Sequence, residues 1–382
     1  MAFAIARKAG GEGRLVGGLV RDVLLRDTPL GRMPDDHDRL DIDMSVNLPI
    51  ASFRRAALDE NIKIIDTGLE HGSVTLVHET QTIEVTQTRA DLNTDGRHAE
   101  IGFTPSFLED AKRRDFTINA LYVSQDGTIH DPLDGMADIT AKQLRFIGDV
   151  EARIVEDYLR ILRYFRFIAA LDGFACDKDE MAKMKRHFNG LSHLSPERVV
   201  TELQKLFTGA NWQEAVRLMA EAGLDSALFS GDFLSPHQLQ NDLSTWQSRL
   251  ASTLSDDMAR HMLTHPLSRK DKAKITSVMQ PFSEADYHIL ASDNWQHIAY
   301  FGDESFYERC LVQARFHDTH LDENRRQQIR NFEAPPCPVT GHDLIKAGYQ
   351  AGPDLGEAMR RATDLFVKSN FTLSCDKIIK SL

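Results

Sequence analysis

The chain has 382 residues, of which 42% are hydrophobic and 27% are charged, and its formal net charge is −12. A chain of this length and composition predicts two or more domains with separate cores. The negative charge argues against a protein that coats nucleic acid with its whole surface, so a nucleic-acid ligand requires a local basic track. The four cysteines, Cys176, Cys310, Cys337 and Cys375, lie far apart, which predicts a reducing compartment and argues against a structural zinc site.

The sequence has no segment suited to membrane insertion. Only a short apolar run precedes Arg7, which is too short for a signal sequence or a membrane span, and nothing further along approaches one. We therefore expect a cytoplasmic protein with no membrane partner.

A glycine pair follows the first predicted strand. Residues 13–25 predict a short strand, a turn at Gly17 and Gly18, and the start of an amphipathic helix. Two glycines let the backbone approach a ligand closely and leave N–H groups at the positive end of a helix. The segment is a candidate phosphate cradle, and an ordinary tight turn is the alternative. Residues 27–39, with two prolines, predict a polar loop.

Two acidic residues, Asp41 and Asp43, alternate with apolar residues in a predicted strand over residues 40–46. Successive side chains of a strand point to opposite faces, so both carboxylates share one face. Two carboxylates spaced in this way suit a pair of divalent cations of the kind that two-metal phosphoryl-transfer sites hold. A solvated strand with two surface acids is the alternative.

Two further strands are predicted over residues 73–77 and 82–88. In the second strand Glu84 falls on the polar face, where it is either a third carboxylate beside the metals or an exposed strand residue. Residues 89–110 show little periodicity and predict a long irregular loop, a kind of segment that is commonly functional or mobile.

A basic run leads into the next apolar segment. Arg114 follows two other cations, and Asp115 and Asn119 fall one helical turn apart on one face. The planar fork of arginine suits a triphosphate, and aspartate with asparagine suits ribose hydroxyls. A solvated surface run is the alternative. Residues 143–147 then predict a short strand.

The strongest helical pattern covers residues 151–169. An apolar stripe at 3-and-4 spacing predicts core packing and consists of Leu159, Leu162, Phe165, Ile168 and Ala169. Another face carries Glu156, Arg160 and Arg163, with Asp157 adjacent. These charges either form surface ion pairs or read a base, because a carboxylate beside a guanidinium presents acceptors and donors to Watson–Crick edges.

The C-terminal half predicts helices with irregular breaks beyond about residue 205, for example over residues 213–224. Residues 335–338 are rich in proline and predict a hinge. Residues 340–356 predict a helix, a glycine-rich turn and a second helix. That turn either exposes backbone amides to a phosphate or simply caps a helix.

One histidine pair and two His-Asp dipeptides in this half have spacings found in some metal sites. His261 and His265 are four residues apart but have no acidic partner, which predicts a helix-end pair. His317-Asp318 and His342-Asp343 resemble the dyad of metal phosphohydrolases, although the full spacing of such a site is not evident.

Ordered motifs along the chain resemble those of one family, the tRNA nucleotidyltransferases and bacterial poly(A) polymerases of the class II branch of the polymerase-beta-like superfamily. The motifs are GGLVRD at 17–22 with DID at 41–43, RRDFTINAL at 113–121, DPLDGMADI at 131–139, EDYLRILRYFRF at 156–167 and SPER at 195–198. Their order and spacing agree over residues 13–205, which is more specific than any single motif. The link between GGLVRD and DID, residues 27–39, is longer here than the family usually has.

The resemblance implies an α+β fold with four parts. These are a small mixed-sheet nucleotidyltransferase head over residues 1–138, a helical neck that recognises the nucleotide over 139–208, a helical body over 209–334, and a helical tail that binds tRNA over 335–382.

The resemblance also implies roles for individual residues. Two carboxylates would ligate catalytic Mg²⁺, namely Asp41 and Asp43, with Glu84 as a candidate third ligand. The residues that would hold the triphosphate or the ribose are Gly17, Gly18, Arg21, Arg114, Asp115 and Asn119. The residues that would pair with an incoming C or A are Glu156, Asp157 and Arg160, with Arg163 nearby.

The implied activity is in-line attack of an RNA 3′-hydroxyl on the α-phosphate of CTP or ATP, which adds CCA to tRNA. Poly(A) polymerase is the alternative within the family, but residues 331–382 carry equal numbers of basic and acidic residues and no basic extension. A non-catalytic RNA-binding protein is a third hypothesis. It predicts a broken metal pair, whereas Asp41 and Asp43 are both present. No DNA partner is expected.

Overall fold

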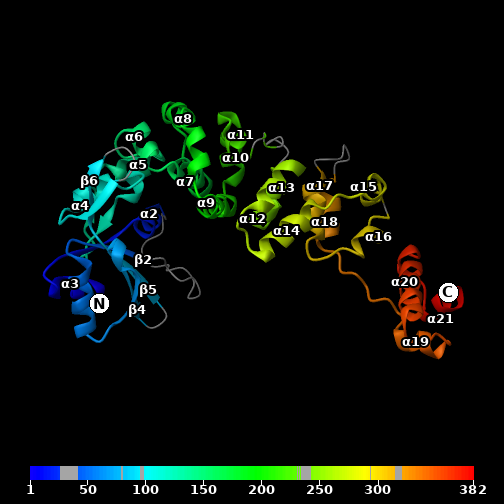
Figure 1. Cartoon of the computed structure of the whole chain (residues 1–382). Helices are drawn as coiled ribbons and strands as arrows, with labels where there is room; N and C mark the ends of the chain where they lie inside the picture. Colours follow the sequence, from blue (N-terminus) through cyan, green and yellow to red (C-terminus); the bar gives the residue numbers. More distant parts are fainter. Residues whose placement is uncertain are drawn as a thin grey trace. The chain divides into compact units, whose positions relative to one another are not determined.

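The computed structural model describes most of the chain: residues 1–25, 42–78, 81–94, 99–229, 231, 233, 242–292, 294–314 and 321–382. It divides into two compact units, Met1–Asp232 and Phe233–Leu382 (Figure 1). The first unit contains a mixed β-sheet followed by helices, and the described part of the second is helical, so the predicted α+β class is confirmed. The four-part division into head, neck, body and tail is finer than these two units and stays a prediction. The predicted loop at 27–39 and Asp41 lie outside the described residues.

The first unit is built on a sheet of seven described strands in the order β3-β4-β5-β2-β1-β8-β9. Strands β2 and β5 run parallel, and the other neighbouring strands pair antiparallel. The bounds of these strands are β1 Gly13–Val16, β2 Ile42–Val46, β3 Lys63–Gly68, β4 Ser73–His78, β5 Gln81–Gln87, β8 Tyr122–Val123 and β9 Ile129–His130. Strand β2 therefore lies at the centre of the sheet, with its polar positions between two neighbours.

The two faces of this sheet differ in polarity. Helices α1 (Ala2–Lys8) and α3 (Ile50–Asp59) pack together over one face. The core beneath them is apolar and contains Ile5, Phe53, Met44, Val74, Leu76 and Val85, among others. Because side chains alternate along a strand, the neighbours of Met44 and Val85 point to the other face, which is where the candidate site residues are found.

The irregular loop predicted over residues 89–110 is wrong. Strands β6 (Arg89–Thr94) and β7 (Ala99–Phe103) pair with each other as a two-stranded antiparallel sheet, and α4 (Phe107–Lys112) follows. Each strand contains only a short alternation, Ala90 and Leu92 in β6 and Ala99, Ile101 and Phe103 in β7, and glycine, asparagine and aspartate interrupt the surrounding sequence. Periodicity therefore gave little signal for them.

Helices complete the first unit. Their bounds are α2 Gly18–Leu25, α5 Gly135–Ala141, α6 Val150–Glu156, α7 Leu159–Ala170, α8 Lys178–Lys185, α9 Pro196–Thr208, α10 Trp212–Ala222 and α11 Leu224–Phe229. Helix α7 packs on α9 and α10, and all five residues of the predicted apolar stripe are buried. The strand predicted over residues 143–147 is replaced by two isolated bridges, Phe116 to Phe146 and Gln143 to Ala175.

The single helix predicted over residues 151–169 is interrupted at Asp157. This residue is extended, with φ −154° and ψ 102°, and it separates α6 from α7. Its Oδ1 accepts the backbone N–H of Leu159 at 3.1 Å. An aspartate that bonds a nearby backbone N–H competes with helix hydrogen bonding, which explains why the apolar period continues while the helix does not.

Glu180 ties α8 to the segment that follows the head sheet. It is 8% exposed, and its Oε1 accepts the backbone N–H of Phe146 at 3.1 Å. Burial raises the pKa of Glu180 to about 7, against an ordinary value of 4.5. The folded protein therefore retains a proton on Glu180 over a pH range in which the unfolded chain has released it.

We expect Glu180→Gln to flatten the pH dependence of stability. Because folding raises this pKa, the free energy of unfolding falls as the pH rises from 4.5 to about 7. At higher pH the buried, ionised carboxylate costs about 3 kcal/mol, at about 1.4 kcal/mol per pH unit. Urea unfolding at about pH 5 and about pH 8 measures this difference. The exposed Asp179→Asn on the same helix should keep the wild-type pH dependence, and an unchanged dependence in Glu180→Gln would contradict the prediction.

The described part of the second unit is built from short helices. Their bounds are α12 Trp246–Ala251, α13 Asp256–Thr264, α14 Arg269–Met279, α15 Glu284–Ala291, α16 Gln296–Ala299, α17 Phe306–Gln313, α18 Glu323–Arg330, α19 Gly341–Lys346, α20 Pro353–Lys368 and α21 Cys375–Ser381. Side chains of Ser, Thr or Asp cap the start of many of them, for example Ser255 and Ser268. Within the described part of the chain, every helix is too short or too polar to cross a membrane.

The described histidine pair and His-Asp dipeptide of this unit lie at helix ends. His261 and His265 lie at the end of α13 with ring centroids 5.1 Å apart, and the described residues contain no group of three or more His, Cys, Asp or Glu arranged to hold a metal. Asp343 forms a capping box with Thr340, whose N–H it accepts at 2.9 Å, so its carboxylate is engaged at the start of α19. His317 and Asp318 lie outside the described residues. The helix, turn and helix predicted over residues 340–356 are confirmed as α19 and the start of α20.

Candidate active site

Two predicted carboxylates, Asp43 and Glu84, meet on the polar face of the sheet. They are register partners in the parallel pair of β2 and β5, so their side chains leave the sheet on the same side. Both line a cavity of about 250 Å³, together with Ser45 and Thr86. Asp41, the other member of the predicted metal pair, lies outside the described residues.

The glycine turn lies against this pair of carboxylates. Gly17 has a φ of +79°, a conformation that favours glycine, and Gly18 begins helix α2. A Cβ atom at Gly17 would lie 3.6 Å from Oδ2 of Asp43 and 3.8 Å from Nη1 of Arg114. The structure thus brings together the predicted phosphate cradle, one predicted metal ligand and one predicted triphosphate-binding arginine.

Arg114 is held in place by hydrogen bonds to three side chains. Its Nη2 donates to Oδ2 of Asp110 at 3.1 Å and to Oγ of Ser45 at 3.2 Å, and its Nε donates to the Tyr122 hydroxyl at 3.2 Å. Burial alone would lower the pKa of Arg114, but Tyr122 and Asp110 outweigh it and raise this pKa. Arg114 therefore presents a permanent positive charge beside Asp43.

Asp110 is the residue of this network that sequence reasoning missed. It is 4% exposed and also accepts from the Tyr122 hydroxyl at 2.9 Å and from the backbone N–H of Arg89 at 3.1 Å. A second cavity of about 190 Å³ is lined by Arg89, Asp110, Arg113 and Arg114. The one signal in the sequence was the spacing of four residues between Asp110 and Arg114, which places them on one side of a helical turn.

Asp115, Asn119 and Arg21 form a buried chain of hydrogen bonds. Oδ1 of Asp115 accepts from Nδ2 of Asn119 at 3.0 Å and from the Phe116 N–H at 2.9 Å, and Oδ1 of Asn119 accepts from Nη1 of Arg21 at 2.7 Å. On its other side, Oδ2 of Asp115 accepts from Nε of Arg163 at 2.7 Å. The short 3₁₀ helix Thr117–Asn119 sets the spacing that was predicted as one helical turn.

The charges in this chain stabilise one another. Burial alone would raise the pKa of Asp115, but Arg163, Asn119 and the Phe116 amide outweigh it, so the pKa is lowered. Burial alone would lower the pKa of Arg163, but the charge and hydrogen bonds of Asp115 outweigh it, so this pKa is raised. The pair stays ionised in the folded protein and joins helix α7 to the segment that carries Arg114.

The charged residues predicted over 156–163 form three separate pairs. Glu156 and Arg160 remain together, with Nη1 of Arg160 donating to Oε2 of Glu156 at 2.7 Å. Asp157 accepts from Nη2 of Arg198 in α9 at 2.7 Å. Arg163 binds Asp115, so its guanidinium has a partner in the triphosphate-binding segment, and its predicted place beside Glu156 and Arg160 stays a prediction.

The residues around Asp43 fit a hard divalent cation. Mg²⁺ prefers carboxylate oxygens, and Asp43 and Glu84 supply adjacent carboxylates at the wall of the cavity. The guanidinium of Arg114 offers positive charge on the same cavity, as a polyphosphate requires. The arrangement can hold a metal-bound triphosphate with its charge shared between cation and arginine.

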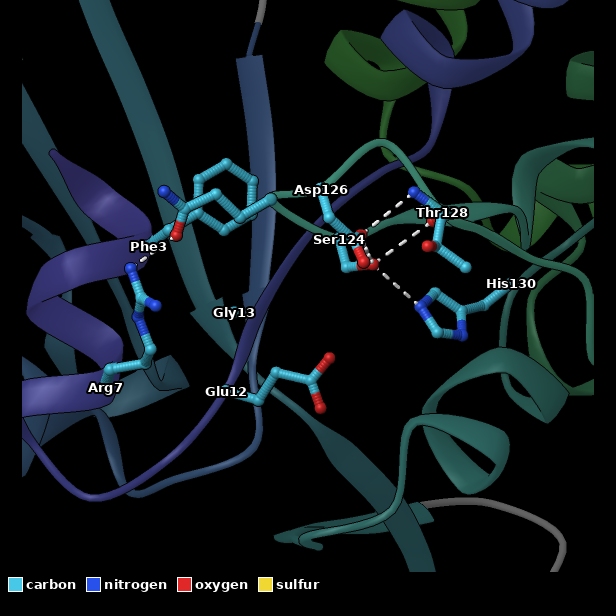
Figure 2. Close-up of a pocket in the computed structure, with 9 residues that line it drawn as sticks. Phe3, Arg7, Glu12, Gly13, Ser124, Asp126, Thr128 and His130 are labelled. Atoms are coloured by element: carbon cyan, nitrogen blue, oxygen red, sulfur yellow. Dashed lines mark hydrogen bonds between the residues drawn. The ribbon is translucent and has the colours of Figure 1, made fainter.

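A larger hollow of about 600 Å³ lies elsewhere in this unit, between α1, β1 and the β8–β9 turn (Figure 2). Its side chains bond to one another: Arg7 donates to Gln125 at 2.6 Å, and Ser124 lies 3.0 Å from Nε2 of His130. None of the described site residues predicted from the sequence lines it. Size therefore does not identify the active site here, whereas the chemistry of the smaller cavity does.

Comparison with known proteins identifies the family of this chain. Residues 13–145 match the Poly A polymerase head domain, and residues 173–231 match the probable RNA and SrmB-binding site of polymerase A. The CCA-adding enzyme of Levilactobacillus brevis is 31% identical to this chain over 382 residues, which cover 91% of this chain and 88% of that protein. This chain belongs to the family of CCA-adding enzymes.

Two further CCA-adding enzymes cover nearly the same span. CCA tRNA nucleotidyltransferase 1, mitochondrial, of Danio rerio is 29% identical, with 97% of this chain and 87% of that protein aligned. The crystal structure of the Bacillus stearothermophilus CCA-adding enzyme in complex with CTP superimposes with a TM-score of 0.75 at 28% identity, covering 100% of this chain and 94% of that one. The family predicted from the sequence motifs is confirmed, and with it the fold of the CCA-adding enzymes.

Proposed function

We propose that this CCA-adding enzyme adds C, C and A in that order to the 3′ end of tRNA, with CTP and ATP as substrates. The observation that carries the proposal is the convergence of Asp43, Glu84 and Arg114 on one cavity, with the Gly17 turn against Asp43 and Arg114. The likeness to CCA-adding enzymes extends over 91% of the chain or more, well beyond the head, which favours CCA addition over poly(A) synthesis. Intact carboxylates at the cavity argue against a non-catalytic RNA-binding protein.

In the proposed mechanism, Asp43 and Asp41 hold Mg²⁺, with Glu84 as a third candidate ligand. Enzymes of this family depend on divalent metal, and the bound ion would supply Lewis-acid activation of the attacking 3′-hydroxyl and neutralisation of phosphate charge. The backbone at Gly17 and Gly18 can approach the triphosphate because no side chain intervenes. Arg114 would stabilise the charge that develops on the leaving pyrophosphate.

Base selection is assigned to the Glu156–Arg160 pair. Cytosine and adenine share an amino group next to an unprotonated ring nitrogen, so a carboxylate can accept from the first while a guanidinium donates to the second. Uracil and guanine present the opposite pattern and would be rejected. Asp157 and Arg163, also predicted to contact the base, are engaged by Arg198 and Asp115 and would act from those positions.

The other elements of the proposal concern partners and compartment. We assign tRNA binding to the helical tail predicted at 335–382, and the match of residues 173–231 to a probable RNA-binding domain supports an RNA partner. All four cysteines are free thiols, which fits a reducing compartment such as the cytoplasm.

The proposal is tested with tRNA transcripts that end before CCA, after C and after CC, each incubated with Mg²⁺ and with CTP or ATP separately. We expect C to be added to the first two transcripts and A only to the third. Long A tails on unrelated RNA would support poly(A) synthesis instead. Absence of any incorporation would support the non-catalytic hypothesis.

A further inference from the structure

Arg153 in α6 contacts both halves of the candidate site without lining either described cavity. Its side chain is buried, with 7% of the residue exposed. Nη2 donates to the backbone carbonyl of Arg114 at 2.7 Å and also to that of Arg113, while Nη1 donates to Oε2 of Glu156. One guanidinium thus bonds to the segment that carries the triphosphate-binding arginine and to the carboxylate assigned to base selection.

Arg160, the other member of the base-selecting pair, also contacts Arg153. Arg160 donates to Oε2 of Glu156 and to the backbone carbonyl of Arg153. Because α6 ends at Glu156 and α7 begins at Leu159, continuous helix hydrogen bonding does not fix Glu156 relative to Arg160. The contacts made by Arg153 fix the position of Glu156 relative to Arg160.

The segment of residues 113–115 is also fixed by contacts of its own side chains. The Arg114 side chain bonds Asp110 and Ser45, and the adjacent Asp115 binds Arg163 of α7. Removing the Arg153 fork would leave this segment anchored by its side chains. What would be lost is the link between it and Glu156.

We propose that Arg153 is a positioning residue that sets nucleotide choice by fixing the Glu156–Arg160 pair at a defined distance from Arg114. This inference rests on the proposed function of the same site. With the base-selecting carboxylate loosened, a nucleotide held by its triphosphate would be accepted with a weaker requirement for an amino group at the base edge. Arg153 touches neither base nor phosphate in this scheme.

The test replaces Arg153 by lysine, which keeps the charge but lacks the planar guanidinium that reaches separated acceptors from two nitrogens, and by methionine, which removes the charge. For each variant, kcat/KM is measured for CTP and UTP on a tRNA transcript lacking CCA, and for ATP and GTP on one ending in CC. We expect the CTP:UTP and ATP:GTP ratios to fall about 10-fold or more, in line with the discrimination that a good bidentate base contact provides. Arg186→Lys, at an exposed arginine of the same unit that pairs with Glu151, should leave both ratios unchanged.

A purely structural role predicts a different result. In that case kcat/KM would fall equally for correct and incorrect nucleotides while the ratios stayed constant, and the inference would be overturned. If the methionine variant does not fold, as judged by thermal melting, the lysine variant carries the test. If the wild-type enzyme adds CCA and the variants keep their ratios, this inference alone is overturned. If the wild-type enzyme does not add CCA, the proposed function is overturned, and this inference with it.

A double-variant comparison localises the effect. If Arg153 acts through Glu156, then Arg153→Lys should change the CTP:UTP ratio much less when Glu156 is already alanine, because residues that act as one unit are not additive. Full additivity of the two changes would contradict the proposed route.

Discussion

Replacement of Asp43 by alanine is expected to abolish nucleotide incorporation, by about a thousandfold or more, because loss of a metal ligand removes several kcal/mol of transition-state stabilisation. Binding of tRNA should change little, since Asp43 lies on the head sheet and tRNA binding is assigned to the helical tail. Gel-shift titration with a tRNA transcript and single-turnover incorporation of CTP measure the two quantities separately.

The matched control is Asp66→Asn. Asp66 is also an aspartate of this sheet, but it lies in β3, where it forms an ion pair with Arg54 away from the cavity, so incorporation should be retained. A parallel Glu84→Gln variant decides the role of the third carboxylate: a loss similar to that of Asp43→Ala would indicate a metal ligand. Near wild-type incorporation by Asp43→Ala, or tRNA binding lost along with incorporation, would refute the metal role.

The second large effect is expected for Asp115→Asn, through both stability and activity. The amide cannot balance the charge of Arg163, and the chain to Asn119 and Arg21 loses its ionised acceptor. Breaking a buried ion pair costs about 3–5 kcal/mol, and the partial exposure of Arg163 reduces the expected loss to about 2 kcal/mol. Urea unfolding measures this loss. Incorporation should fall about 100-fold, because α7 and the Arg114 segment lose their shared anchor.

The pH dependence of this variant gives an independent check. Because folding lowers the pKa of Asp115 below its ordinary value of 3.8, its stabilising contribution is complete above that value. The contribution is lost as the pH falls through the lower, folded-state pKa. The difference in unfolding free energy between wild type and Asp115→Asn should therefore be constant near neutral pH and shrink in acid.

A buried carboxylate of the second unit serves as its control. Glu308 is 6% exposed and forms an ion pair with Lys274. Glu308→Gln should lower stability by a similar amount, while incorporation per folded molecule changes less than about threefold. Equal losses of activity in the two variants would show that Asp115 matters only through stability.

The sequence was most informative where the pattern depends on neighbours along the chain. The stripe through Leu159 and Phe165 has helical spacing, and its burial follows from that spacing alone. The strand of Asp43 and the turn at Gly17 were likewise predicted from local alternation and glycine content. That they lie close together was implied by the resemblance to a family, and the described residues show Asp43 and Glu84 on one cavity with Gly17 next to Asp43.

Other features depended on partners far away in the sequence. Nothing near Arg163 indicates that it binds Asp115, and nothing near Arg153 indicates carbonyl partners in residues 113–114. The break at Asp157 arises because a side-chain hydrogen bond competes with an otherwise favourable helical period. Hydrophobic periodicity reports on burial and does not reveal where polar side chains find their partners.

The parallel register of β2 and β5 constrains how this protein can tolerate insertions. Asp43 faces Glu84 because Met44 and Val85 are also aligned, each pair on its own side of the sheet. Gaining or losing one residue in front of Glu84 within β5 would bring Ile83 or Val85 beside Asp43 and turn Glu84 toward the apolar core. Within β5 the carboxylate site survives only changes that preserve the alternation.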